Sequence, residues 1–232
     1  MKTKVSKIVS YFGYELGIFI LLGIQAFLNR EMIINMENDF YSYYLVDFSM
    51  GFNSRMLVGS FINLLTDNPT ASWLKGFMIA VLVIALLAVS LVIGRIIRCV
   101  DKEKRNILYV FVLFFVFGTL TMYGFSRYFG LLDVHMFLCA LLAVVFATNK
   151  YLRWFVPVLC VAGVFIHQGF ALSFFPLVIG AAFYMTFTDE NKKAKKAVFV
   201  LSAAATVAAV VYCVTIGTET MTITFEEMCE IV

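Results

Sequence analysis

The residues best suited to chemistry lie in one long segment, residues 29–72, which mixes charged side chains with aromatics and aliphatics. Asp39 and Asp47 are its candidate proton acceptors, and Arg55 follows Asp47 across Gly51. Because glycine allows the backbone to turn back, Asp47 and Arg55 are expected to approach each other. Such a carboxylate can act as a general base toward a hydroxyl group or bind a divalent cation. A structural Asp47–Arg55 salt bridge, or solvation of both groups, is the alternative.

A second set of polar residues interrupts the apolar runs of the chain. Arg127 occupies a turn between two runs, and its planar guanidinium suits a phosphate or a carboxylate. Asp133 lies about one turn inside the next run, where an ionisable side chain is a candidate functional residue. His167 and Gln168 must find partners or face a water-filled cavity. For Asp133, a structural pair with Arg127 or Arg55 is the alternative.

The histidines and cysteines predict no metal site. His135 stands two positions after Asp133, so on a helix the two side chains point roughly away from each other. The five cysteines show no ligand-like spacing and are interpreted as small buried hydrophobic residues. A divalent cation held by carboxylates is the one cofactor considered, and the cofactor is otherwise unknown.

The composition indicates which solvent surrounds these residues. Hydrophobic residues make up 62% of the 232 positions, charged residues 14%, and three residues are proline. The mean hydropathy is +0.92. A water-soluble domain rarely carries such values, so a single integral membrane domain, residues 1–232, is expected in a lipid bilayer. Nucleic-acid binding has no support.

The apolar runs predict an all-α, polytopic transmembrane helix bundle of about seven spans. Residues 154–187 are too many for one crossing, so this stretch must fold back, and His167-Gln168-Gly169 is the predicted break. By the same reasoning the stretch 107–147 turns at residues 124–127. The predicted spans are 12–28, 74–94, 107–123, 129–147, 154–166, 170–187 and 197–216.

The basic residues predict the orientation. In this topology 14 of the 18 lysines and arginines fall on one side of the membrane. Short basic loops stay in the cytoplasm, so the N-terminus is predicted on the cytoplasmic side of the membrane and the C-terminus on the outer side. Residues 29–72 then form a long first outer loop. The inner residues are Lys2, Lys4, Lys7, Arg95, Arg98, Lys102, Lys104, Arg105, Lys150, Arg153, Lys192, Lys193, Lys195 and Lys196.

Two local features are also expected. Apolar residues recur at helical spacing from Ser54 to Thr66, which predicts a helix along the membrane surface with Ser54 as its N-cap. Glu15 lies near the inner end of the first span, and it is expected to pair with Lys7 or to reach the headgroups.

Three short motifs carry a resemblance to a protein family. The string Tyr44 to Gly59, YLVDFSMGFNSRMLVG, resembles a segment of uncharacterised bacterial membrane proteins of surface-polysaccharide synthesis. Ser126-Arg127-Tyr128 with Asp133 resembles a second motif of those proteins, and Ile166-His167-Gln168 before Phe175-Pro176 resembles a third. The third motif has glutamate where this chain has Gln168. The resemblance extends from Asp39 to Pro176.

The resemblance implies a membrane glycosyltransferase of the C superfamily, or a polysaccharide polymerase, that uses a polyprenyl-phosphate-linked sugar on the extracytoplasmic face. By analogy Asp47 or Asp39 serves the acceptor, and Arg55 and Arg127 hold the lipid phosphate. His167 joins the catalytic set, while Asp133 and Gln168 join the substrate-binding set. An envelope-synthesis complex is the expected partner besides the bilayer and the polyprenyl-linked sugar.

A non-enzymatic transporter, flippase or membrane-complex subunit is the alternative, so enzymatic activity is left open. Geometry separates the two interpretations, because a transferase needs its charged side chains to line one outward cavity. The resembling proteins have more helices, and the chain is therefore interpreted either as a whole protein or as an N-terminal fragment. The charged side chains in question are Asp47, Arg55, Arg127, Asp133 and His167.

Overall fold

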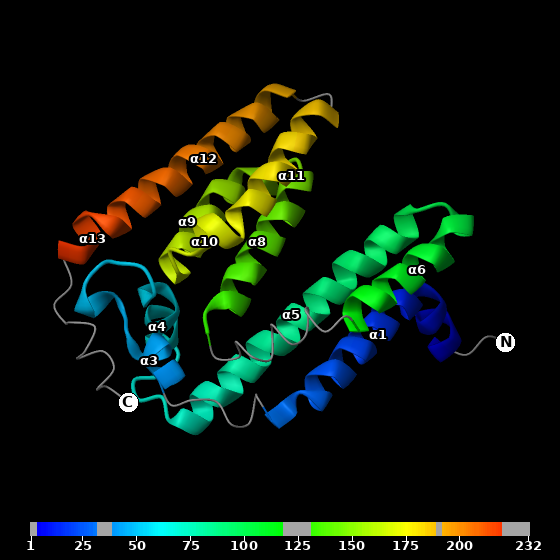
Figure 1. The fold of residues 1–232 in the computed structure, drawn as a ribbon, viewed down its shortest axis with the longest axis horizontal. Coiled ribbons are helices and arrows are strands. Elements are labelled where there is room, and N and C mark those ends of the chain that lie inside the picture. Colours follow the sequence, from blue (N-terminus) through cyan, green and yellow to red (C-terminus); the bar gives the residue numbers. More distant parts are fainter. Residues whose placement is uncertain (1–3, 32–38, 118–130, 189–191, 220–232) are drawn as a thin grey trace. The chain divides into compact units, whose positions relative to one another are not determined.

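The computed structural model describes residues 4–31, 39–117, 131–188 and 192–219 (Figure 1). Within these ranges the chain forms helices and no β-strand, which confirms the all-α prediction. The chain divides into two compact units. One unit holds the described parts of Met1–Met36 and Gly76–Gly130, and the other holds those of Glu37–Lys75 and Leu131–Val232.

The first unit contains α1 (Lys4–Leu28), most of α5 (Ala71–Cys99) and α6 (Lys102–Phe117). Glu15 on α1 is only 4% exposed, and it forms an ion pair with Arg98 on α5. Its charge partner among the described side chains is therefore Arg98, while the side chain of the predicted partner Lys7 lies outside them. Arg105 closes the turn between α5 and α6, because its guanidinium donates to the carbonyl oxygens of Arg98 and Val100, each at 2.8 Å.

Among the residues that the structure describes, two helices are long and apolar enough to cross a membrane. They are α5, with 29 residues, and α12 (Lys192–Val214), with 23. At a rise of 1.5 Å per residue they reach roughly 43 and 35 Å, more than the ~30 Å hydrocarbon core of a bilayer. Helices overlap all seven predicted span positions. Besides α5 and α12, the apolar helices of the described residues are shorter: 12–28 within α1, α8, the segment 152–166, and α11.

Four helices of the second unit pack in a ring. They are α8 (Asp133–Thr148), α9 (Val156–Ile166), α11 (Phe175–Thr188) and α12, and each contacts the next in the order α8, α9, α12, α11. Small buried side chains such as Ala140, Ala143 and Ala209 line their contacts and allow close approach. The 3-10 turn η2 (Leu152–Phe155) joins α8 to α9, and α13 (Ile216–Glu219) follows α12.

The predicted break at residues 167–169 is confirmed. Helix α9 ends at Ile166, His167 is extended with φ −162° and ψ 131°, and the short helix α10 (Phe170–Ser173) leads into α11. Figure 1 shows α9 and α11 running in opposite directions on either side of this break. The chain also reverses at η2, between α8 and α9, so the beginning of α8 and the end of α9 lie at the same end of the ring.

A folded segment covers that end of the ring. It consists of α3 (Asp39–Leu45), the 3-10 turn η1 (Phe48–Met50) and α4 (Met56–Asn63), and α4 contacts α9 (Figure 1). Helix α4 lies within the predicted surface helix but is shorter, and its buried face holds Met56, Val58 and Ile62. The predicted Ser54 cap is wrong, since Arg55 is the residue at the N-cap position and makes no side-chain cap.

Candidate functional site

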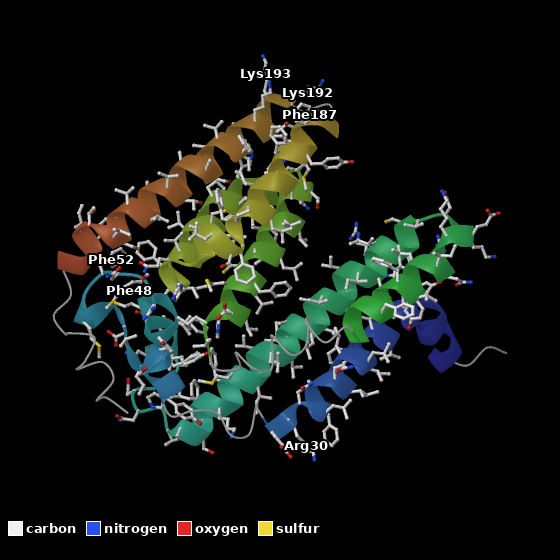
Figure 2. All side chains as sticks on the ribbon, viewed as in Figure 1. Arg30, Phe48, Phe52, Phe187, Lys192 and Lys193 are labelled. Atoms are coloured by element: carbon white, nitrogen blue, oxygen red, sulfur yellow. The ribbon has the colours of Figure 1, made fainter. Side chains whose placement is uncertain are left out.

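An aromatic cluster fastens the segment to the helix ring. The rings of Phe48 and Phe52 stack with centroids 4.6 Å apart. Phe52 also contacts Phe165 on α9, at 5.1 Å, and Tyr212 on α12, at 5.7 Å. Figure 2 labels Phe48 and Phe52 beside the end of α12. Because such aromatic contacts add to the burial of the rings, this cluster holds residues 48–52 in a fixed position against two helices.

Asp47 folds the segment back on itself. One carboxylate oxygen accepts a hydrogen bond from the Ser49 backbone N–H at 2.6 Å, which caps η1. The other oxygen accepts from the side-chain amide of Asn63 at the end of α4. Ser60 reinforces this contact, because its hydroxyl accepts from the Phe48 N–H at 2.9 Å. Asp47 is thus 8% exposed and occupied by two structural hydrogen bonds.

Arg55 stands at the turn that this folding creates. Among the described residues it is the one non-glycine residue with positive φ, at 73°. Its backbone N–H donates to the carbonyl oxygen of Phe165 at 2.9 Å, which ties it to the end of α9. Its guanidinium lies 5.4 Å from the centre of the Tyr43 ring. A left-handed conformation costs about 1–3 kcal/mol in a residue other than glycine, and such strain gathers at functional sites.

The guanidinium of Arg55 meets His167 rather than Asp47. Arg55 Nη2 lies 3.1 Å from His167 Nε2, while His167 Nδ1 accepts from the Gly169 N–H at 2.8 Å. A neutral imidazole whose Nδ1 accepts carries its proton on Nε2. Nε2–H and the guanidinium are then neighbouring donors with no acceptor between them. An anionic oxygen placed at this point would satisfy both.

Burial, together with the charge of Arg55, keeps the His167 ring neutral. Burial, and then the positive charge of Arg55, lower the pKa of His167 below its ordinary value of 6.5. The negative charge of Asp133 acts in the opposite direction and raises this pKa. The net shift is downward, so at neutral pH the ring is a hydrogen-bond donor through Nε2 and not a cation.

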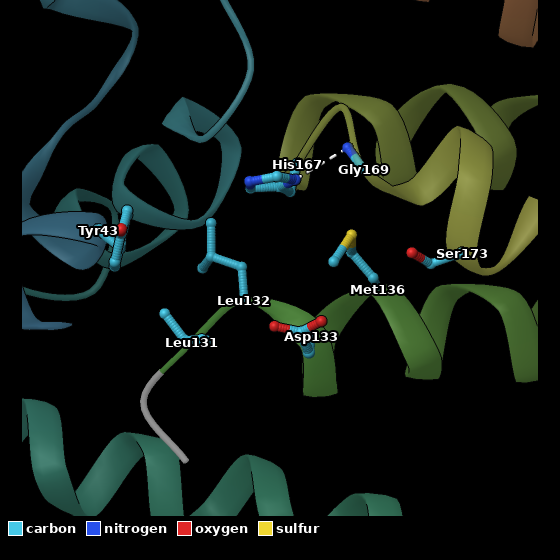
Figure 3. Close-up of a pocket in the computed structure, with 8 residues that line it drawn as sticks. All are labelled: Tyr43, Leu131, Leu132, Asp133, Met136, His167, Gly169 and Ser173. Atoms are coloured by element: carbon cyan, nitrogen blue, oxygen red, sulfur yellow. Dashed lines mark hydrogen bonds between the residues drawn. The ribbon is translucent and has the colours of Figure 1, made fainter. Parts of the chain in front are cut away.

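A pocket of about 250 Å³ opens beside these groups (Figure 3). Figure 3 shows Asp133 and His167 on two sides of it, one from the first turn of α8 and the other from the break after α9. Its volume is at the low end for ligand sites, which suits a small polar group better than a large organic molecule. The pocket is lined by Tyr43, Leu131, Leu132, Asp133, Met136, His167, Gly169 and Ser173.

Asp133 supplies the negative charge of the pocket. It lies in the first turn of α8, where the helix dipole stabilises a carboxylate. Burial, and then the charge of Asp133, raise the pKa of Tyr44, so this phenol stays protonated. The neighbouring His135 has its ring 5.7 Å from that of Tyr44, centre to centre. The structure therefore brings Arg55, Asp133 and His167 to one end of the ring.

The other predicted site residues lie elsewhere or outside the described residues. Gln168 is exposed beside the pocket and does not line it. Asp39 begins α3, but its side chain is outside the described part of the chain, as is the whole of Arg127. Sequence reasoning missed Ser173, although it follows Gly169 by one helical turn, and that spacing places both on the same side of the break.

No protein-family model, curated protein or solved structure matches this chain. Within the described ranges no group of three metal-binding side chains occurs. The chemistry of the site therefore follows from its own geometry: the Arg55 guanidinium lies 3.1 Å from His167 Nε2, and a carboxylate stands across the pocket from the histidine. Such an arrangement can bind a phosphate and take up a proton from a neighbouring hydroxyl group.

Proposed function

We propose that this chain is a membrane glycosyltransferase or polysaccharide polymerase that uses a polyprenyl-phosphate-linked sugar. It would act at the extracytoplasmic face of a bacterial plasma membrane, with the N-terminus inside. The observation that carries the proposal is the meeting of two donors, Arg55 Nη2 and His167 Nε2, 3.1 Å apart beside the carboxylate of Asp133. The membrane setting rests on α5 and α12, which are long and apolar enough to span a bilayer.

The phosphate of the donor lipid would lie between Arg55 and His167. A charged oxygen there accepts from both groups, and hydrogen bonds to charged groups contribute about 1.5–3 kcal/mol each. The strained backbone of Arg55, with φ 73°, is consistent with a functional role, because such strain gathers at functional sites. The exposed apolar residues Leu64 and Phe61 of the covering segment would lie at the membrane surface, near the polyprenyl tail.

Asp133, and not Asp47, is the proton acceptor in this proposal. Both carboxylate oxygens of Asp47 accept hydrogen bonds, from Ser49 and from Asn63, whereas Asp133 lines the pocket. Asp133 would take the proton of the acceptor hydroxyl as that oxygen attacks the sugar carbon and the lipid phosphate leaves. His167 is then a positioning donor for the leaving phosphate. Its Nδ1 accepts from Gly169, so its Nε2 has no lone pair to act as a base.

Phosphate recognition can be tested with the purified protein in detergent micelles. The probes are a long-chain polyprenyl monophosphate and the corresponding polyprenol, and the readout is binding affinity. Loss of one charge-assisted contact predicts roughly 10- to 100-fold weaker binding of the phosphate in Arg55→Gln. The control is Arg30→Gln, an exposed arginine at the end of α1 (Figure 2), which should bind as the parent does. Equal affinities in both variants would remove the phosphate site.

A second variant separates binding from folding. Arg55→Gly removes the guanidinium but also relieves the positive φ, which glycine adopts freely. This variant should unfold at the temperature of the parent or above it, and still lose the phosphate. Catalysis is tested with Asp133→Asn, which should keep the phosphate affinity and lower surface-glycan assembly in cells by about 100-fold or more. Normal glycan in Asp133→Asn would leave a flippase or a binding subunit as the better interpretation.

A further inference from the structure

A buried arginine lies at the opposite end of the second unit. Arg153 belongs to η2, between α8 and α9, and is 5% exposed. Its Nε donates to the carbonyl oxygen of Asn149 at 3.3 Å, which is a long hydrogen bond. Its Nη1 is buried and has no hydrogen-bond partner among the described residues. A guanidinium is always charged, so a buried and incompletely hydrogen-bonded one destabilises the fold unless an anion joins it.

The surroundings of Arg153 are positive. Lys195, in the first turn of α12, is 8% exposed, and Lys192 and Lys193 project from the same end of the ring (Figure 2). Figure 2 also shows that this end is opposite Phe48 and Phe52, and therefore opposite the candidate site. The N-termini of α9 and α12 both lie here, and neither has an acidic residue in its first turn. The C-termini of α8 and α11 lie at this end too, so the helix dipoles oppose one another and the positive potential comes from the side chains.

Exposed aromatic residues indicate that this end meets the membrane surface. Tyr151, the N-cap residue of η2, is 77% exposed, and Trp154, directly after Arg153 in η2, is 50% exposed. Tyrosine and tryptophan gather at the level of the lipid headgroups, because one part of each ring system is apolar and another is polar. A phosphate that reaches Arg153 would therefore come from the headgroup layer, where basic pockets between helices bind anionic lipids.

We propose that Arg153 and Lys195 hold the phosphate of an anionic lipid headgroup at the inner end of this four-helix ring. The planar fork of Arg153 would donate through Nη1 to a phosphate oxygen, and Lys195 would add a point charge. The lipid is bound as a structural ligand, with no bond made or broken. This site is independent of the polyprenyl-phosphate site, since the two lie at opposite ends of the ring.

The test compares phosphatidylglycerol with phosphatidylcholine, which share acyl chains but differ in headgroup charge. Native mass spectrometry of the whole purified chain measures how much of each lipid it retains. The parent should hold phosphatidylglycerol roughly 10-fold more tightly or better, and Arg153→Gln should hold the two equally. Arg153→Lys keeps the charge without the fork and should fall between them. Arg95→Gln, an exposed arginine on α5, is the matched control and should behave as the parent does.

Three results would overturn the proposal. The first is an unchanged lipid preference in Arg153→Gln, or in Arg153→Lys if the glutamine variant does not fold. The second is displacement of the lipid by an equal concentration of inorganic phosphate, which would make free phosphate the ligand. The third concerns Asp189 and Glu190, which lie outside the described residues: a preference seen only in the Asp189→Asn, Glu190→Gln double variant would show that a carboxylate of the chain itself neutralises Arg153.

Discussion

At the residue scale, the two ring nitrogens of His167 both face hydrogen-bond donors, and a neutral imidazole can accept from only one of them. The Gly169 N–H, at 2.8 Å, is held by the local backbone, whereas Arg55 Nη2 belongs to a long side chain. The backbone contact therefore fixes the tautomer, and the guanidinium is left beside Nε2–H. This conflict between donors is what an anion would relieve.

The pH dependence of stability follows from the lowered pKa of His167. Burial and Arg55 depress this pKa below 6.5 in the folded chain, so the unfolded chain binds more protons as the pH falls through 6.5. The contribution of His167 to stability is complete above about pH 6.5 and is lost on acidification. We expect the unfolding temperature in micelles to fall between pH 7.5 and pH 5, and to fall less in His167→Gln.

Arg55→Gln tests whether the lowered pKa of His167 causes this loss of stability in acid. It keeps the histidine but removes the positive charge, so the pKa of His167 should rise and the acid sensitivity should weaken. His135, the other histidine of the chain, is unchanged in both variants. An acid-induced loss of stability that is identical in all three proteins would assign the effect to groups other than His167.

Asp47 offers a direct contrast between a structural carboxylate and a catalytic one. Asparagine keeps one acceptor oxygen for the Ser49 cap, and its NH2 group can donate to the Asn63 side-chain oxygen once that amide turns over. Asp47→Asn should therefore keep the fold to within about 1 kcal/mol, and keep the glycan-forming activity. Asp47→Ala should destabilise the chain by about 1–2 kcal/mol, because the Ser49 cap and the Asn63 contact are both lost. Thermal unfolding and glycan assembly measure the two effects. Activity lost in Asp47→Asn at normal stability would return the role of base to Asp47.

The sequence identified the region that holds the candidate site, but it did not show which of its residues are structural and which are functional. It placed Arg55 and His167 among the candidates from their residue types and apolar neighbours. It could not foresee that Asp47 turns toward Ser49 and Asn63, since those contacts depend on how tightly residues 47–63 fold back. Hydrogen-bond partners within a loop depend on its three-dimensional path, and charge and spacing alone do not determine that path.

At the element scale, the break after α9 depends on one glycine that touches an aromatic ring. A Cβ atom at Gly163 would lie 2.6 Å from the Phe170 ring, and both residues are buried. Gly163→Ala should therefore destabilise the chain by about 1–3 kcal/mol through overpacking and displace the adjacent His167. The matched control is Gly180→Ala on α11, where nothing lies within 4 Å of the added carbon.

Thermal unfolding and polyprenyl phosphate affinity report on this prediction together. Gly180→Ala should be neutral or slightly stabilising, since alanine is favoured over glycine within a helix by roughly 0.5–1 kcal/mol. Equal behaviour of the two alanine variants would mean that Phe170 moves aside freely and that the break does not depend on Gly163.

The position of the break itself could be predicted from length, because a mostly apolar stretch of 34 residues is too long to cross a bilayer once. The contact between Gly163 and Phe170 could not be predicted, because it depends on the angle between α9 and α10.

At the scale of the whole molecule, the second unit has two ends with different chemistry. One end holds the pocket lined by His167 and Asp133, with Arg55 against His167, and the other gathers Arg153 and Lys195 among exposed lysines. The distribution of lysines along the sequence predicted this difference before any contact was known. The division into two compact units was not predicted, because hydropathy identifies helices but does not show which of them pack together.

The orientation of the second unit in the membrane is the last property to test. The proposed function requires its pocket end to face away from the cytoplasm. In a chain whose five cysteines are replaced by alanine, Asp67→Cys should react with a membrane-impermeant maleimide in intact cells. Lys102→Cys, at the beginning of α6, is the control and should react only after the cells are opened. Both positions are exposed, so accessibility within the protein does not limit either reaction. Moving the lysines and arginines of the inner loops across the membrane is energetically unfavourable, so these loops, and Lys102 with them, are expected to stay in the cytoplasm. The reverse labelling pattern would place Arg55 and His167 in the cytosol, where a nucleotide-linked sugar would be the donor to consider in place of a lipid-linked one.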